Sequence, residues 1–254
     1  MPSSAQALTT TAASHLLAAG TYAPSPLWYI TRATGVVALL LLTGTVALGV
    51  AGTARLETSA MPRLVRSGLH RNLSMLAVAF VAVHVVTAVL DPYAGIKLMS
   101  AVIPFSSSYR PLWIGLGAVA FDMLLALIIS SLIRARLPYR AWRAVHFLAY
   151  ACWPVALWHG LGTGTDSRLP WLVLLDATCV LVVAVAAGWR IRLSPRADLR
   201  RVGLFATAGI MAATGAFTAI GPLQPGWARR AGTPVHAASA VHATPTAERT
   251  GSSA

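Results

Sequence analysis

Long apolar stretches alternate with short polar and Arg-rich connectors along most of this chain. We identify six such stretches, at residues 27–50, 69–90, 111–133, 143–161, 170–189 and 202–221. Each is about 20 residues long, which is enough for a helix to cross the roughly 30 Å hydrocarbon core of a bilayer. The pattern therefore predicts an all-α bundle of six transmembrane helices.

The two ends of the chain have a different composition. Residues 1–26 are rich in Ala, Ser and Thr, and they lack the basic and apolar regions of a removable signal peptide. Residues 222–254 are rich in Pro, Ala, Thr and Ser, as disordered segments are. We therefore predict disordered tails at 1–26 and 222–254 around one membrane domain at 27–221.

Composition supports the membrane class and argues against a nucleic-acid partner. Hydrophobic residues make up 56% of the chain and charged residues 11%. The net charge of +13 comes mostly from the connectors between apolar stretches, and no nucleic-acid-binding motif accompanies it. The lipid bilayer is the partner that this composition predicts.

The connectors also predict the orientation in the membrane. The first, third and fifth connectors and the helix ends beside them carry 13 arginines, whereas the second and fourth connectors carry three basic residues. Basic residues concentrate in cytoplasmic loops. We therefore expect a multi-pass protein of the cell (plasma) membrane with both termini outside the cytoplasm.

Four histidines lie within the predicted helices. His70 and His84 are 14 residues apart in the second, and His146 and His159 are 13 apart in the fourth. Because one helix intervenes, these two helices run in the same direction. His70 and His146 are thus predicted at an inner, cytoplasmic depth, and His84 and His159 at an outer depth.

This spacing suits metal ligation at two levels. Fourteen residues of helix span about 21 Å and place both imidazoles on one face, offset by about 40°. Two such helices side by side present the neutral imidazoles that two stacked haems require, one on each side of each macrocycle. The 13-residue spacing would turn the second imidazole by about 220° on an ideal helix. Pro154 lies between the two histidines and disturbs the winding there.

Two other interpretations of the histidines stay open at this point. A single imidazole near a helix end, such as His70 or His146, is often only an interfacial residue. Zinc or copper is the other metal option, but two histidines per level are too few for a closed tetrahedral site. Ionisable residues inside a membrane are rare and usually functional, which favours haem.

Three stretches of the chain resemble a known family. They are "WYITRATGVVALLLLTGTVALGV", "LHRNLSMLAVAFVAVH" and residues 109–167, which begin "YRPLWIGLG". Over about residues 27–190 the chain resembles the ferric reductase-like transmembrane domain. This domain is shared by ferric reductases, NADPH oxidases and the haem-binding membrane subunit of the periplasmic methionine sulfoxide reductase system. The resemblance implies two b-type haems and electron transfer across the membrane. It assigns the inner haem to His70 and His146 and the outer haem to His84 and His159.

The chain departs from the larger members of that family. No Gly-rich dinucleotide fingerprint follows a predicted strand, and we expect no cytoplasmic flavin and NADPH domain. The electron donor is then a separate molecule: a quinol, a free or protein-bound flavin, or another reductase. The acceptor on the outer side is a protein or a ferric substrate that these residues do not identify.

Four arginines are candidate partners for haem propionates. Arg32 and Arg110 are predicted at the outer level, and Arg71 and Arg143 follow or precede the inner histidines. The alternatives are snorkelling for Arg32 and ordinary positive-inside charge for Arg71 and Arg143.

The sequence thus predicts a transmembrane diheme cytochrome b that passes single electrons from a cytoplasmic-side donor to an extracytoplasmic acceptor. It would be the electron-transfer component of an oxidoreductase. Two alternatives stay open: a haem-containing membrane anchor subunit for a partner redox protein, and a quinol-oxidising cytochrome b.

Overall fold

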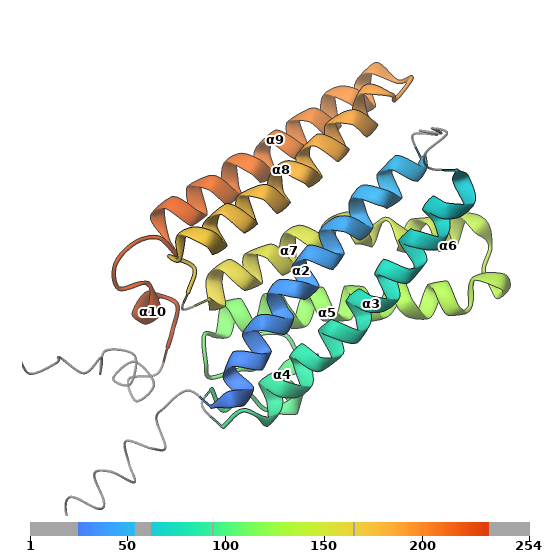
Figure 1. Cartoon of the computed structure of the whole chain (residues 1–254). Helices are drawn as coiled ribbons and strands as arrows, with labels where there is room; N and C mark the ends of the chain where they lie inside the picture. The colour runs from blue at the N-terminus through green and yellow to red at the C-terminus, as the bar shows by residue number, and fades with distance from the viewer. Residues whose placement is uncertain (1–24, 54–61, 93, 165, 234–254) are drawn as a thin grey trace, which may run out of the picture.

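The computed structural model describes residues 25–53, 62–92, 94–164 and 166–233, and every regular element in these ranges is a helix (Figure 1). Five helices are long and apolar enough to cross a membrane. They are α2 (Pro26–Thr53), α3 (Arg63–Leu90), α5 (Pro111–Leu132), α8 (Pro170–Arg192) and α9 (Ala197–Ile220). The predicted all-α class is confirmed for the described residues.

The predicted helix at 143–161 is interrupted. It corresponds to α6 (Tyr139–His146) and α7 (Leu148–Thr163), separated by Phe147. Phe147 keeps helical dihedral angles, φ −66° and ψ −18°, but the Tyr150 N–H donates to the Phe147 carbonyl three residues back, which tightens this turn. Alone, the 16 residues of α7 span about 24 Å, less than the hydrocarbon core. The predicted count of six spanning helices is therefore not confirmed by helix length.

The remaining differences concern helix ends and short elements. α3 begins at Arg63 and α9 at Ala197, several residues before the apolar runs begin. Arginine is a good helix former, so Arg-rich turns can extend an apolar helix beyond the membrane core. Two short elements, α4 (Leu98–Val102) and the 3₁₀ helix η1 (Arg134–Arg136), lie in connectors.

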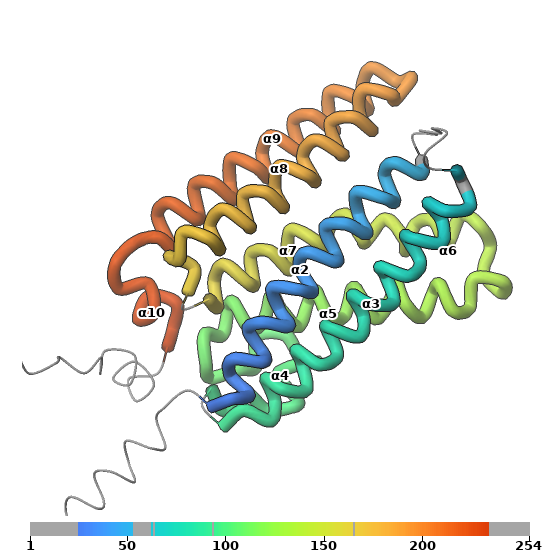
Figure 2. Tube along the Cα trace, in the orientation of Figure 1, coloured from blue at the N-terminus to red at the C-terminus, as the bar shows by residue number. Residues whose placement is uncertain are grey.

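The long helices pack in neighbouring pairs (Figures 1 and 2). α2 packs along α3, α5 along α7, and α8 along α9, while α2 also contacts α7 and α8. Among the described residues no comparable packing joins α3 to α6 or α7. The start of α2 and the end of α9 lie at the same end of the bundle.

The buried core lies where α7 meets α2, α8 and α9. Its buried members are Trp153, Leu157, Leu161 and Cys179. Two indole N–H groups of α7 reach threonine hydroxyls of neighbouring helices: Trp153 donates to Thr43 of α2, and Trp158 to Thr214 of α9, each at 2.9 Å. These hydrogen bonds satisfy polar groups that lipid cannot satisfy, and so they fix α7 between its neighbours.

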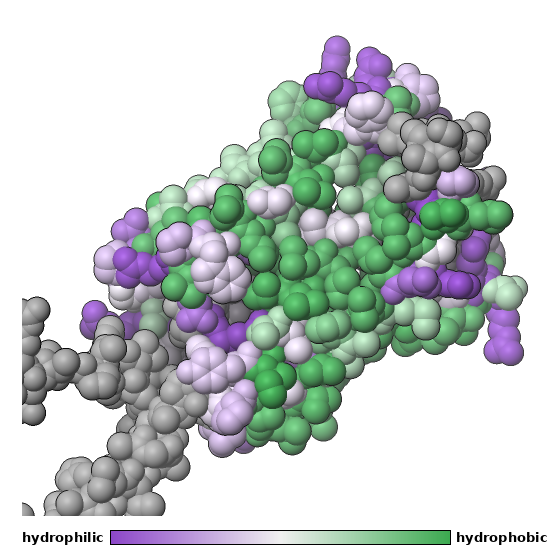
Figure 3. Space-filling view, in the orientation of Figure 1, coloured by the Kyte–Doolittle hydropathy of each residue, from purple (hydrophilic) through white to green (hydrophobic). Residues whose placement is uncertain are grey.

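The outer surface of the bundle is apolar. Figure 3 shows hydrophobic residues over the middle of the visible face and polar residues toward its two ends. Large apolar side chains such as Leu64, Leu132 and Phe205 are at least 77% exposed. Such a surface is unfavourable in water and suits a hydrocarbon environment. Together with the five apolar helices, it indicates a multi-pass membrane protein.

Residues 222–233, which the sequence assigned to a disordered tail, have defined structure. They contain the short helix α10 (Trp227–Arg230). Trp227 packs against Trp113 with ring centroids 5.5 Å apart, and its indole N–H donates to the Gly162 carbonyl at 3.2 Å. The prediction of a disordered tail rested on average composition, which does not show that a single tryptophan can hold the segment in place. The rest of the two predicted tails, 1–24 and 234–254, lies outside the described residues.

The hydrogen bond between Trp153 and Thr43 gives a stability test. Thr43→Val keeps the shape of the side chain but leaves the buried indole N–H unpaired, so we expect a loss of about 1 kcal/mol in unfolding free energy. Thermal unfolding in detergent measures it. Thr178→Val is the control, because the Thr178 hydroxyl is exposed and bonds only within its own helix. Equal stability of the two variants would contradict the assigned role.

Trp227 gives a second test. Trp227→Ala removes the ring contacts with Trp113 and Phe217 and the hydrogen bond to Gly162, which hold the segment 222–233. The backbone amides of this segment should therefore exchange about tenfold faster. Hydrogen–deuterium exchange with mass spectrometry measures this. Trp189→Ala, at a residue that is 48% exposed, serves as the control. Unchanged exchange in residues 222–233 would show that Trp227 does not hold the segment.

Candidate functional site

The structure brings the four membrane histidines together in two pairs. His70 of α3 faces His146 of α6 with ring centroids 6.5 Å apart and an interplanar angle of 67°. His84 of α3 faces His159 of α7 with centroids 6.1 Å apart at 85°. The pairs are those expected from equal depth. Along the continuous helix α3 the two levels lie about 21 Å apart.

The distance within each pair fits one metal ion between two imidazoles. An imidazole nitrogen lies about 2 Å from a metal that it binds, and the ring centre lies about 1 Å farther away, so facing ligands have centroids about 6 Å apart. The observed values are 6.5 and 6.1 Å. Both pairs therefore have the spacing of two axial ligands.

Backbone carbonyls orient the rings of the His84–His159 pair. Nδ1 of His84 lies 2.7 Å from the Thr31 carbonyl oxygen, and Nδ1 of His159 lies 2.8 Å from that of Trp113. A carbonyl oxygen only accepts, so each Nδ1 carries the hydrogen and donates it. Nε2 of each neutral ring is left as the nitrogen that can bind a metal.

The His70–His146 pair is less symmetric. Nδ1 of His70 lies 3.0 Å from the Thr45 carbonyl oxygen, as at the other level. The His146 ring instead stacks on Trp142, with centroids 4.9 Å apart, and its buried Nδ1 has no hydrogen-bond partner in the described part of the chain. The guanidinium of Arg134 covers the same indole at 4.4 Å.

The donor set favours a metal that arrives with ligands of its own. Within the described ranges no three His, Cys, Asp or Glu residues gather as a metal site. A haem supplies four in-plane nitrogens and needs only two axial ligands from the protein. α3 and α7 present facing imidazoles without packing on each other, as a flat group between them requires.

Arg32 lies near the His84–His159 pair but has partners within the chain. Its guanidinium forms an ion pair with Asp166 and lies over the Trp28 ring at 4.6 Å. It follows Thr31, whose carbonyl orients His84. A role for Arg32 toward a propionate stays a prediction.

Arg110 is fully buried and also bonds within the chain. Its side chain donates to the Thr233 hydroxyl at 2.8 Å and to the Gly162 carbonyl at 3.0 Å. Its backbone N–H donates to the Gly232 carbonyl, and it adopts a left-handed conformation with φ 44°. Arg110 therefore ties the C-terminal segment to α5 and α7, and its propionate role stays a prediction.

At the Arg-rich end, the structure points to an arginine that sequence reasoning missed. Arg71 and Arg143 are both exposed, and the Arg143 guanidinium lies over Phe147 at 5.5 Å. Arg66 is only 6% exposed and lies four residues before His70, on the same face of α3. The apolar pattern predicts a helix that begins at residue 69, which leaves Arg66 in the connector.

Sequence reasoning also missed the glycines beside the rings. They are Gly35 against His84, Gly49 against His70 and Gly117 against His159. A signal existed in the sequence, because Gly35 and Gly49 are 14 residues apart, as His70 and His84 are.

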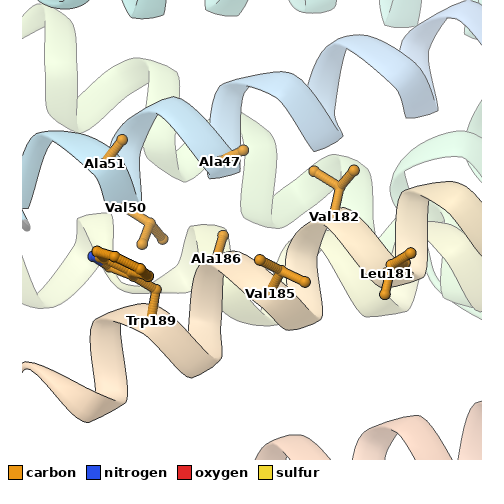
Figure 4. Close-up of a pocket in the computed structure, with 8 residues that line it drawn as sticks. All are labelled: Ala47, Val50, Ala51, Leu181, Val182, Val185, Ala186 and Trp189. Atoms are coloured by element: carbon orange, nitrogen blue, oxygen red, sulfur yellow. The ribbon is translucent and has the colours of Figure 1, made fainter. Parts of the chain in front are cut away.

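An apolar groove lies between α2 and α8 (Figure 4). It is lined by Ala47, Val50, Ala51, Leu181, Val182, Val185, Ala186 and Trp189. Gly49 of α2 contacts His70. The α2 residues of the groove, Ala47, Val50 and Ala51, lie about 100–200° around the helix axis from Gly49. The groove therefore belongs to the outer, lipid-facing surface rather than to the histidine site.

Comparison with known proteins gave one match. Residues 34–157 match the sequence profile of the family described as ferric reductase like transmembrane component. The matched range contains His70, His84 and His146, and His159 follows two residues after its end. The comparisons with curated proteins and with solved structures each gave no match.

Proposed function

We propose, from the membership of residues 34–157 in the ferric reductase like transmembrane family, that this membrane protein is a diheme cytochrome b that passes single electrons across the bilayer. The family points to membrane electron transfer. The observation that carries the diheme assignment is the presence of two facing imidazole pairs, with centroids 6.5 and 6.1 Å apart, at two depths of one bundle.

In this proposal His70 and His146 hold one haem b, and His84 and His159 hold the other. A haem iron with two imidazole ligands supplies a one-electron couple and leaves no coordination position open for a substrate. The chain's own contribution would be to present neutral imidazoles, to keep Nε2 of His70, His84 and His159 free of protons, and to surround the rings with an apolar bundle. The terminal reaction then takes place on a separate acceptor.

Arginines at each level would hold the negatively charged propionates. At the His70–His146 level we add Arg66 to the predicted Arg71 and Arg143, because it is buried on the face of α3 that carries His70. At the other level Arg32 is the better placed candidate, one residue from the carbonyl that orients His84.

The direction of transfer is part of the proposal. The bias of 13 arginines against three basic residues supports a cytoplasmic location for the His70–His146 end. α6 and α7 would cross together as the fourth span, which agrees with a described chain that begins and ends at one end of the bundle. A flavin, quinol or separate reductase would donate from the cytoplasm, and a protein or ferric acceptor would receive the electrons outside.

Haem content tests the assignment of ligands. Purified protein, expressed with adequate haem supply, should hold two low-spin b-type haems per chain, measured as the pyridine haemochrome. His84→Ala or His159→Ala should leave one, because each removes an axial ligand of one level only. His236→Ala is the control and should keep both, because the sequence predicts His236 in the C-terminal tail. A wild-type protein without a Soret band would end the proposal.

Transfer across vesicles separates an electron conduit from a membrane anchor. Protein in lipid vesicles should pass electrons from enclosed dithionite to external ferricyanide. His70→Ala should lose most of this transfer while it keeps the haem of the other level, because one relay position is missing. An anchor subunit predicts no transfer in either protein, and that result would overturn the proposal.

A further inference from the structure

Three of the four membrane imidazoles have the same surroundings. In each case Nδ1 lies within 3.0 Å of a backbone carbonyl oxygen, and the ring packs on a glycine four residues after that carbonyl. We call these carbonyl–glycine pairs. They are Thr31–Gly35 at His84, Thr45–Gly49 at His70 and Trp113–Gly117 at His159.

Helix geometry explains the four-residue spacing. The Cβ at position i+4 leans back toward the N-terminus, over the turn that contains the carbonyl of residue i. A side chain at that position would cover the carbonyl. A Cβ built at Gly117 would lie 2.5 Å from Nδ1 of His159, and one at Gly35 would lie 3.0 Å from Nδ1 of His84. Glycine therefore opens the carbonyl to the imidazole.

Gly49 is the least crowded of the three positions. A Cβ there would lie 3.3 Å from Cε1 of His70. A substitution at Gly49 should therefore disturb its imidazole less than one at Gly117.

His146 lacks such a pair. On α5, the residues 14 positions after Trp113 and Gly117 are Leu127 and Ser131, so no glycine occupies the corresponding place. The Leu127 carbonyl accepts the Ser130 hydroxyl at 3.1 Å. This agrees with the buried Nδ1 of His146, which finds no hydrogen-bond partner among the described residues.

We propose that the three carbonyl–glycine pairs are positioning elements that hold His70, His84 and His159 as the Nδ1-protonated tautomer and strengthen them as iron ligands, whereas His146 has no such support. This inference rests on the proposed haem ligation. A hydrogen bond from Nδ1–H to a carbonyl raises the basicity of the imidazole, which favours ferric over ferrous iron. The His84–His159 level then has two strengthened ligands, and the His70–His146 level has one.

The experiment uses glycine-to-alanine variants in a background with a single haem. His70→Ala should leave only the His84–His159 haem. In that background Gly117→Ala or Gly35→Ala should raise the midpoint potential, by about 59 mV for a tenfold change in the ferric-to-ferrous preference. Gly49→Ala in the same background should leave the potential unchanged, since its own imidazole is already absent. Potentiometric titration and the low-spin ferric electron paramagnetic resonance signal are the readouts.

The converse background completes the design. In His84→Ala, Gly49→Ala should raise the potential of the remaining haem, and Gly117→Ala should not. Gly209→Ala and Gly215→Ala are matched controls in both backgrounds, because a Cβ at either position meets nothing within 4 Å. For a variant that no longer binds haem, the histidine tautomer is measured in the haem-free protein. Nitrogen NMR of ¹⁵N-histidine then reports whether the affected ring has lost the Nδ1-protonated tautomer.

The outcomes separate the two proposals. A wild-type protein that binds no haem refutes the proposed function. A wild-type protein with two haems, combined with glycine variants that move neither potential nor tautomer, refutes the positioning role alone. A potential shift confined to the level of the substituted glycine supports the role.

Discussion

A polar ring inside a membrane bundle must find its hydrogen-bond partners within that bundle, and this constraint organises the present structure. Lipid offers no partner to an imidazole N–H, so an unsatisfied one is costly. Carbonyls of α2 and α5 accept the Nδ1–H of His70, His84 and His159. Nε2 of each of these rings is therefore free to bind a metal, and the proposed irons would lie between the two rings of each pair.

The helix packing follows from the same need. α2 lies against α3 and supplies the carbonyls for His70 and His84, while α5 lies against α7 and supplies the one for His159. These two helix pairs carry three of the four rings, and α6 carries His146. The rings face each other across a region where α3 packs on neither α6 nor α7. The hydrogen bonds from Trp153 and Trp158 fix α7 relative to α2 and α9. The bundle accordingly presents the imidazoles in fixed positions, which suits electron transfer that needs little rearrangement of the protein.

Sequence alone predicted the helical class and the grouping of the histidines, because apolar length and depth are one-dimensional properties. It did not predict the break at Phe147, since a local 3₁₀-type bond does not alter hydropathy. Sequence alone also placed Arg66 in a connector, because an arginine ends an apolar run in the sequence without ending the helix. The carbonyls were missed because every residue has one, so the sequence does not single them out. The glycines were missed because the 14-residue spacing of Gly35 and Gly49 gains its meaning only when their helix is known to lie beside His70 and His84. The packing role of Trp227 was missed because the segment around it is rich in Pro and Ala, a composition typical of disordered tails.

The central proposal is that the two imidazoles of each facing pair bind one haem iron. X-ray absorption at the iron edge of the purified, haem-loaded protein tests it most directly, because this measurement reports the atoms bound to iron without reference to activity. The account predicts six nitrogen ligands per iron at about 2 Å, with the multiple-scattering signature of two imidazoles. Five-coordinate iron, or a single imidazole opposite a sulfur or oxygen ligand, would contradict it.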